Sequence, residues 1–177
     1  MYYVKKSTNK LISFCYCKSM NELSDEIYDQ IKALSSEGDE FAEAGCYQEA
    51  LEKYWVAWDL LPEPKTNWDA ALWIQAAIGD ANFFRGDFET SLNNFLSAMQ
   101  VEGAIGNPFL HLRIGQCEFE LGNHVRAADE MSRAYMAEGM SIFKDDDPKY
   151  LTFLKTHLQP PVGGWEYEKK QPWWKIW

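Results

Sequence analysis

The spacing of hydrophobic positions predicts helices along most of this chain. After Ser24, a residue type that often caps helices, apolar side chains recur at intervals of three, four and seven residues as far as Phe41. This spacing places them on one face of a helix that is expected to end near Ala44. A second stretch, about 47–61, carries a similar apolar stripe and stops at Pro62, which cannot continue a helix.

The same pattern continues toward the C-terminus and predicts an all-α protein. Further helices are expected over residues 67–84, 89–101, 108–121, 125–138 and 149–158. Glycine-containing turns follow residues 84 and 121, and aspartates precede Pro148 as a cap for the last helix. The helices are therefore expected to form three hairpins followed by a final single helix.

Small and aromatic residues recur at fixed offsets within the predicted hairpins. In the first hairpin they are Gly38, Phe41, Gly45, Tyr47, Ala50, Tyr54, Ala57 and Pro62. This spacing resembles the tetratricopeptide repeat, a helix–turn–helix unit of about 34 residues. Weaker copies follow at Gly79, Gly86, Phe88, Phe95 and Ala98, and at Gly115, Gly122, Ala127 and Ala134. The first glycines of the three copies are 41 and then 36 residues apart, so the linkers are longer than the family norm.

The repeated residues have defined physical roles in such a hairpin. Gly38 lacks bulk where the two helices cross, and Phe41 and Tyr54 are expected to fill the space beside the crossing. Gly45 supplies the positive φ that a tight reversal demands. The resemblance therefore implies an α-α solenoid of three hairpins, with the helix at 149–158 covering its open end.

The two ends of the chain differ from the predicted helical domain, residues 21–158. Residues 1–20 carry four lysines and no acidic residue, and we expect a disordered or adventitious extension there, since no signal-peptide cleavage site follows the short apolar run. Residues 159–177 form an aromatic tail with four of the eight tryptophans. This tail either folds back onto the helices or docks into a partner.

The charge of the chain favours a basic protein as partner. The net charge is −10, and residues 21–177 contain 13 basic against 27 acidic residues, a net charge of −14. A negative field of this size repels nucleic acid, so the acidity either attracts a basic protein or only keeps the chain soluble. No apolar run approaches the roughly 18 residues of a membrane span. We therefore expect a cytoplasmic protein that binds neither nucleic acid nor a membrane.

Recognisable patterns for catalysis or metal binding are absent from the sequence. His111, His124 and His157 lie far apart without metal-ligand spacing, and the pair Cys15 and Cys17 has no nearby histidine. Neither a phosphate-binding glycine loop, a nucleophile elbow nor a kinase signature occurs. We therefore expect no enzyme activity, no metal and no cofactor.

In tetratricopeptide proteins, the first helices of successive units line a concave groove. The resemblance places eight candidate partner-binding residues there: Asp39, Glu43, Trp73, Asp80, Phe84, Phe109, Gln116 and Glu120. Of these, Asp39, Asp80 and Glu120 are expected to be exposed, because an unpaired buried carboxylate is costly. The three aromatic residues either line the groove or pack between helices.

The groove lacks the basic clamp with which some members of the family hold the C-terminal carboxylate of heat-shock chaperones. The corresponding positions hold Ser35, Asp39, Ala77 and Phe109, and only Arg113 matches the clamp. An acidic groove would repel a terminal carboxylate. The resemblance therefore disfavours a heat-shock co-chaperone.

The stretches 107–117, 135–139 and 148–155 look like those of small stand-alone bacterial tetratricopeptide proteins, some of which are immunity proteins of polymorphic toxin systems. The resemblance implies a non-catalytic protein that binds and neutralises a cognate toxin, and the acidity fits a basic toxin. The alternatives are a chaperone for a secreted translocator, which would hold an extended peptide in the groove, and a general scaffold.

Overall fold

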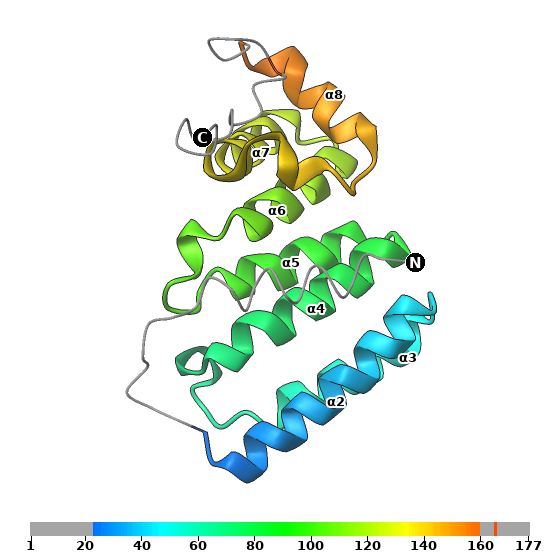
Figure 1. Ribbon diagram of the computed structural model, residues 1–177, viewed down its shortest axis with the longest axis vertical. Coiled ribbons are helices and arrows are strands. Elements are labelled where there is room, and N and C mark those ends of the chain that lie inside the picture. The colour runs from blue at the N-terminus through cyan, green and yellow to red at the C-terminus, as the bar shows by residue number, and fades with distance from the viewer. Residues whose placement is uncertain (1–22, 160–164, 166–177) are drawn as a thin grey trace, which may run out of the picture.

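The computed structural model describes residues 23–159 and residue 165, and this part of the chain is helical with no strand (Figure 1). Its α-helices are α2 (Asp25–Glu43), α3 (Tyr47–Asp59), α4 (Asp69–Arg85), α5 (Phe88–Ala98), α6 (Pro108–Glu120), α7 (His124–Glu138) and α8 (Pro148–His157). Short 3-10 helices lie at η1 (Lys65–Asn67), η2 (Ala104–Gly106) and η3 (Gly139–Phe143). The all-α prediction is confirmed, and the predicted helix ends lie within a few residues of the observed ones. None of these three 3-10 helices was predicted.

Side chains cap the starts of several helices, as the sequence pattern predicts. The Ser24 hydroxyl accepts a hydrogen bond from the Ile27 amide at the start of α2, and Asn107 and Asp147 cap α6 and α8. These bonds satisfy backbone amides that have no partner within the helix. The first residue of each of these helices is therefore set locally.

Helices that are neighbours in the sequence pack against each other. The main pairs are α2 with α3, α4 with α5 and α6 with α7, and the pairs are joined by packing of α3 on α4 and of α5 on α6. Figure 1 shows the pairs following one another along the long axis, with α8 at the end opposite α2. As expected for a helix that covers the end of the stack, α8 packs on α7 and η3.

One close contact is repeated where the two helices of each pair cross. It joins Gly38 to Tyr54, Gly79 to Phe95 and Gly115 to Met131. A Cβ atom on Gly79 would lie 2.7 Å from Cε1 of Phe95, and one on Gly115 would lie 2.7 Å from Cγ of Met131. Only glycine allows this approach, so the prediction that a small residue marks each crossing is confirmed.

The turn between the helices of each pair is also repeated. Gly45, Gly86 and Gly122 have φ values of 77°, 84° and 82°. In every turn the amide after the glycine bonds to a carbonyl five residues earlier: Cys46 to Phe41 at 2.9 Å, Asp87 to Asn82 at 3.0 Å and Asn123 to Glu118 at 2.8 Å. The three pairs therefore share one reversal geometry, which glycine permits because it lacks a Cβ.

The predicted role of Phe41 is wrong. Its side chain is 37% exposed, while the equivalent residues Asn82 and Glu118 are 4% and 0% exposed. The ring of Tyr54 already fills the space above Gly38, so nothing at the crossing requires the Phe41 ring.

The first helices of the second and third pairs are buried on nearly every side. Every residue of α4 from Ala70 to Phe83 is buried except Trp73, and every residue of α6 from Pro108 to Glu118 is buried except His111. Polar residues on these helices must therefore find partners inside the protein. Despite this burial, none of the helices in the described part of the chain is long and apolar enough to cross a membrane.

Candidate partner-binding face

The eight candidate residues lie on α2, α4 and α6, the first helix of each pair, and we call the side of these three helices that carries them, together with Ser35 on α2, the first-helix face. The structure buries three of them, with Asp80, Phe109 and Gln116 at 4%, 6% and 0% exposure. The other five, Asp39, Glu43, Trp73, Phe84 and Glu120, are half-buried. The prediction that Asp80 is exposed is therefore wrong.

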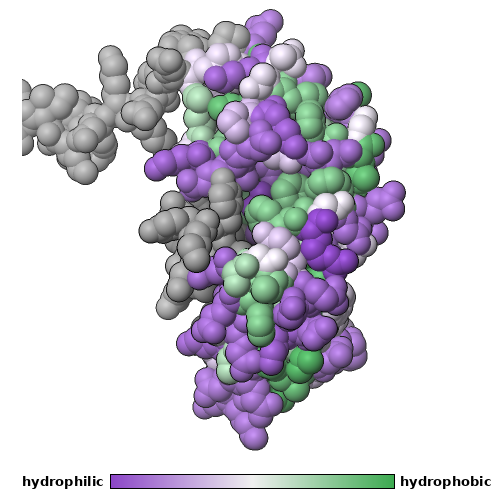
Figure 2. Space-filling model, turned by 90° about the vertical axis from the view of Figure 1, so that its right-hand side faces the viewer, coloured by the Kyte–Doolittle hydropathy of each residue, from purple (hydrophilic) through white to green (hydrophobic). Residues whose placement is uncertain are grey.

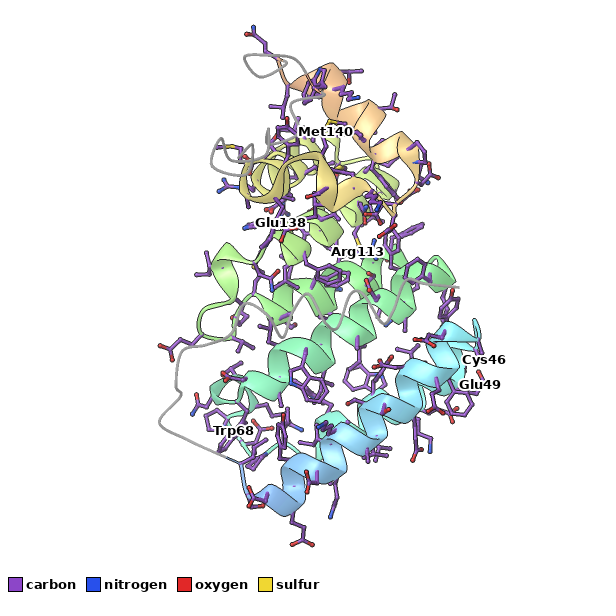
Figure 3. All side chains as sticks on the ribbon, viewed as in Figure 1. Cys46, Glu49, Trp68, Arg113, Glu138 and Met140 are labelled. Atoms are coloured by element: carbon purple, nitrogen blue, oxygen red, sulfur yellow. The ribbon has the colours of Figure 1, made fainter. Side chains whose placement is uncertain are left out.

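Asp80 is buried because Arg113 pairs with it. The Arg113 Nε atom donates to Oδ1 of Asp80 at 2.7 Å, and its Nη1 atom donates to Oε1 of Gln116 at 2.7 Å and to Oδ1 of Asp146 at 2.8 Å. The Arg113 side chain, labelled in Figure 3, is only 4% exposed. A single guanidinium thus connects α4, α6 and the loop before α8.

Aromatic rings surround the same guanidinium. Its central carbon lies 5.1, 5.3 and 5.4 Å from the ring centres of Phe83, Phe84 and Phe109. Burial alone would lower the pKa of Arg113, but the carboxylates of Asp80 and Asp146 raise it, so the charged form persists. The buried charge of Arg113 is therefore compensated by two carboxylates and by cation–π contacts with the surrounding rings.

Arg113 thereby brings together four of the predicted residues: Asp80, Phe84, Phe109 and Gln116. The sequence pattern had singled out Arg113 only as a lone match to a carboxylate clamp. In the structure its carboxylate partners belong to the protein itself. Phe109 packs between helices, which is one of the two alternatives that the sequence left open. The centres of the Phe109 and Phe95 rings lie 6.2 Å apart in an edge-to-face contact.

A tyrosine hydroxyl holds the carboxylate of Asp39. The Tyr54 hydroxyl donates to Oδ1 of Asp39 at 2.8 Å. Burial raises the pKa of Tyr54, and the charges of Asp39, Asp80 and Glu43 raise it further. These three candidate carboxylates therefore act on one buried hydroxyl, although they come from two helices.

A second tyrosine and a lysine hold Glu120 at the other end of the face. The Tyr150 hydroxyl on α8 donates to Oε1 of Glu120 at 2.7 Å, and the Lys149 ammonium lies 2.7 Å from the same oxygen. Burial and this hydrogen bond raise the pKa of Tyr150, and the hydrogen bond to Glu120 raises the pKa of Lys149. The terminal helix α8 thus positions a residue of α6.

The first-helix face and its edge carry more acidic than basic groups. Five carboxylates, from Asp39, Glu43, Asp80, Glu120 and Asp146, are accompanied by the cations of Arg113 and Lys149. Figure 2 shows the molecule from its side, where hydrophilic side chains cover most of the visible described surface and smaller hydrophobic patches lie between them. Trp73 packs against the hydrophobic core from its edge.

The described histidines and cysteines serve packing and local hydrogen bonding. His111 contacts Glu130 and the Ile105 carbonyl, and His124 packs on the Phe119 ring. Burial raises the pKa of Cys117 to about 12, so its thiol stays protonated at neutral pH. Within residues 23–159, no three His, Cys, Asp or Glu side chains are grouped so that they could hold a metal ion. The hydrogen bonds of the first-helix face therefore serve to hold the carboxylates of Asp39, Asp80 and Glu120 in place.

The aromatic tail contacts the helical domain at its one described tryptophan. The ring of Trp165 lies 5.5 Å from that of Tyr135 on α7, and the Lys155 ammonium lies 5.8 Å from its centre. This favours the fold-back alternative for Trp165. The other three tail tryptophans lie outside the described residues.

Neither a protein-family model nor a curated protein sequence matches this chain.

Proposed function

We propose that the three helix pairs form a tetratricopeptide-like solenoid covered at one end by α8. Three repeated features support this proposal: the glycine contact at each crossing, the left-handed glycine in each turn and the backbone hydrogen bond after it. They occur at the positions at which the sequence copies align. In such a solenoid α2, α4 and α6 would line one continuous face.

We further propose that the protein is a non-catalytic binder of a basic protein, and that the first-helix face is its binding surface. The observation that carries this proposal is the set of carboxylates fixed by internal hydrogen bonds, with Asp39 held by Tyr54 and Glu120 held by Tyr150. Fixed charges lose little conformational freedom on binding, so they contribute more to affinity than mobile ones. They also attract a basic partner over several ångströms.

The function that fits best is that of an immunity protein that neutralises a cognate basic toxin. A toxin that acts on nucleic acid has a basic active face, and an acidic protein surface can occupy it by charge complementarity. The resemblance of the sequence to small bacterial tetratricopeptide proteins supports the same role.

A chaperone for a secreted translocator is the second candidate, and a specific observation favours it. Oγ of Ser35 and Nε2 of Gln116 are buried without a hydrogen-bond partner on α2 and α6. Such groups can bond to the backbone of an extended peptide. A general scaffold is the third candidate.

Purification of the native protein with its bound partner tests these functions. An immunity protein should retain a folded basic domain, whereas a chaperone should retain a chain that is unfolded without it. Circular dichroism of the released partner separates the two outcomes. Recovery of the protein with neither kind of partner would contradict the proposed binding function.

Charge neutralisation then tests the first-helix face with the captured partner. The double variant Glu43→Gln and Glu120→Gln should lower affinity about tenfold and reduce its salt dependence. Glu49→Gln with Glu52→Gln, at exposed positions on α3, removes the same charge from a different surface and serves as the control. Equal losses in both variants would remove the first-helix face from the proposal. Asp80 is kept because its loss would remove one of the two carboxylates that compensate the buried charge of Arg113.

A further inference from the structure

Two buried polar atoms on the first-helix face have no partner. Ser35, which is 8% exposed, lies one helical turn before Asp39 on α2. Gln116 is 0% exposed and uses its Oε1 atom to accept from Arg113, so its amide nitrogen lies in the same cluster. Neither Oγ of Ser35 nor Nε2 of Gln116 is hydrogen-bonded. A buried donor without a partner costs about 1–3 kcal/mol, so this face is built to be completed by further hydrogen-bonding groups.

The chain itself contains a segment whose chemistry matches this face. Residues 1–20, which lie outside the described residues, carry Lys5, Lys6, Lys10 and Lys18 and no acidic residue. Apolar and aromatic residues lie between these lysines. The first-helix face presents the opposite charge, with Asp39, Glu43 and Glu120 beside aromatic rings.

We propose that residues 1–20 bind to the first-helix face of their own chain as an internal ligand, which the basic partner must displace. This inference rests on the proposed function, because it assigns a regulatory occupant to the same face. The lysines pair with its carboxylates, and the backbone and polar side chains of the segment supply partners for Ser35 and Gln116. An internal competitor of this kind lowers the apparent affinity of every basic protein for the face by the same factor, so only tight-binding proteins still occupy it.

The segment is long enough to reach the whole face. It joins α2 through residues 21–24, and α2 is 19 residues long, which corresponds to about 28 Å at about 1.5 Å per residue. Twenty residues span about 30 Å as a helix and up to about 65 Å when extended. Packed helices lie about 8–10 Å apart, so α4 and α6 are both within reach of a segment that starts beside α2.

The charge balance favours this segment over a second copy of the chain. Residues 21–177 carry a net charge of −14, with 13 basic against 27 acidic residues, so two helical domains repel each other. The segment is also tethered to the face, which gives it an effective concentration in about the millimolar range and a smaller loss of association entropy than a separate molecule would have. An intramolecular contact therefore needs only weak intrinsic affinity.

Zero-length carbodiimide crosslinking of the full chain tests this placement directly. Mass spectrometry of the monomer should show amide bonds from the four lysines to Asp39, Glu43 and Glu120. These bonds should be about tenfold more frequent than bonds to the exposed control residues Glu49, Glu52 and Glu89, and should fall in high salt. An even distribution over both sets would overturn the inference. Crosslinks confined to a dimer would also overturn it and would identify a second copy as the occupant.

A competition experiment on the full chain provides the second test. The probe is a synthetic peptide of residues 1–20, and the variant replaces all four lysines by glutamine in the intact protein. The peptide should bind the variant about tenfold more tightly than the wild type, because the internal competitor is weakened. Equal affinity would exclude self-binding. Neither test requires the basic partner, so failure here leaves the proposed function to be decided by the purification of the native complex.

Discussion

Arg113 on α6 and Arg133 on α7 both bond to carboxylates, but in opposite surroundings. The Arg113 side chain is 4% exposed and bonds to Asp80 and Asp146, while Arg133 is 56% exposed and bonds to Asp129 one turn earlier on its own helix. Water and salt screen the exposed pair, so its net contribution to stability is small. The buried cluster has lost its hydration, so removal of Arg113 takes away the cation that compensates the carboxylates of Asp80 and Asp146.

The helices that carry the two arginines also differ in how deeply their side chains are buried. On α7 only Ala127, Met131 and Ala134 are buried, they form one stripe, and the other side chains are half-buried or exposed. On α6 nearly every side chain is enclosed, and its polar groups are connected to α4 and α8. The charges of Asp80 on α4 and Arg113 on α6 therefore belong to the internal structure, whereas the charges of Asp129 and Arg133 on α7 lie at the surface.

The largest expected effect tests the buried pair. Arg113→Met should lower the free energy of unfolding by about 3–5 kcal/mol, because the carboxylates of Asp80 and Asp146 both lose the buried cation that compensates their charge. Urea unfolding followed by circular dichroism measures this loss, and Arg133→Met, as the matched control, should leave the midpoint nearly unchanged. The double variant Asp80→Leu and Arg113→Met should recover part of the stability, since only Asp146 then lacks its cation. A loss of less than about 1 kcal/mol in Arg113→Met would contradict this account of the cluster.

The glycine crossings provide the next largest effect. Gly115→Ala should cost about 1–3 kcal/mol, because its Cβ would lie 2.7 Å from Cγ and 2.9 Å from the backbone nitrogen of Met131. Gly79→Ala should cost less, since only the Phe95 ring must move. A Cβ atom on Gly106 would have no atom within 4 Å, so Gly106→Ala should leave the stability nearly unchanged. Equal unfolding midpoints for all three variants would show that the helix pairs are not closely packed at the crossings.

A smaller effect should depend on pH. The hydrogen bond between His111 and Glu130 raises the pKa of His111. Burial lowers this pKa, and the hydrogen bond to the Ile105 carbonyl raises it further. Because the folded-state pKa is the higher one, the pair stabilises the protein fully below the unfolded pKa of about 6.5 and loses this contribution as pH rises through the folded value.

Unfolding free energies of the wild type and of His111→Gln, measured at several pH values from acid to alkaline, isolate this contribution. The difference between the two proteins should shrink as pH rises. Glu130→Gln should remove most of this pH dependence while keeping a hydrogen-bond acceptor. A difference that grows with pH would show that the histidine is neutral in the folded protein.

The smallest expected effect concerns the tail. Trp165→Ala removes the edge contact with Tyr135 and the cation–π contact with Lys155, which together are worth about 1 kcal/mol at such a half-buried site. Thermal unfolding should show a slightly lower midpoint, while Trp165→Phe should retain most of the stability. An unchanged midpoint with reduced partner binding would assign the tail to the partner instead.

The amino-acid sequence by itself determined the local structure of this protein. Periodic apolar residues marked the seven α-helices of the described residues, Ser24 and Asp147 marked helix starts, and Gly38, Gly79 and Gly115 marked the crossings. These features depend on residues within one or two helices of each other, so spacing alone reveals them. The gathering of candidate residues on first helices follows from the same spacing.

Only the tertiary structure decided which charges are buried and what they contact. Asp80 was expected in water, yet it pairs with Arg113, which is 33 residues away, and Asp146 completes the pair from beyond α7. Glu120 depends in the same way on Tyr150 from α8. Helical periodicity specifies the face of the helix on which a carboxylate lies. The free-energy cost of burying that carboxylate depends on a cation from a distant segment of the chain. The position of this cation is set by the packing of whole helices, which spacing within one helix does not reveal.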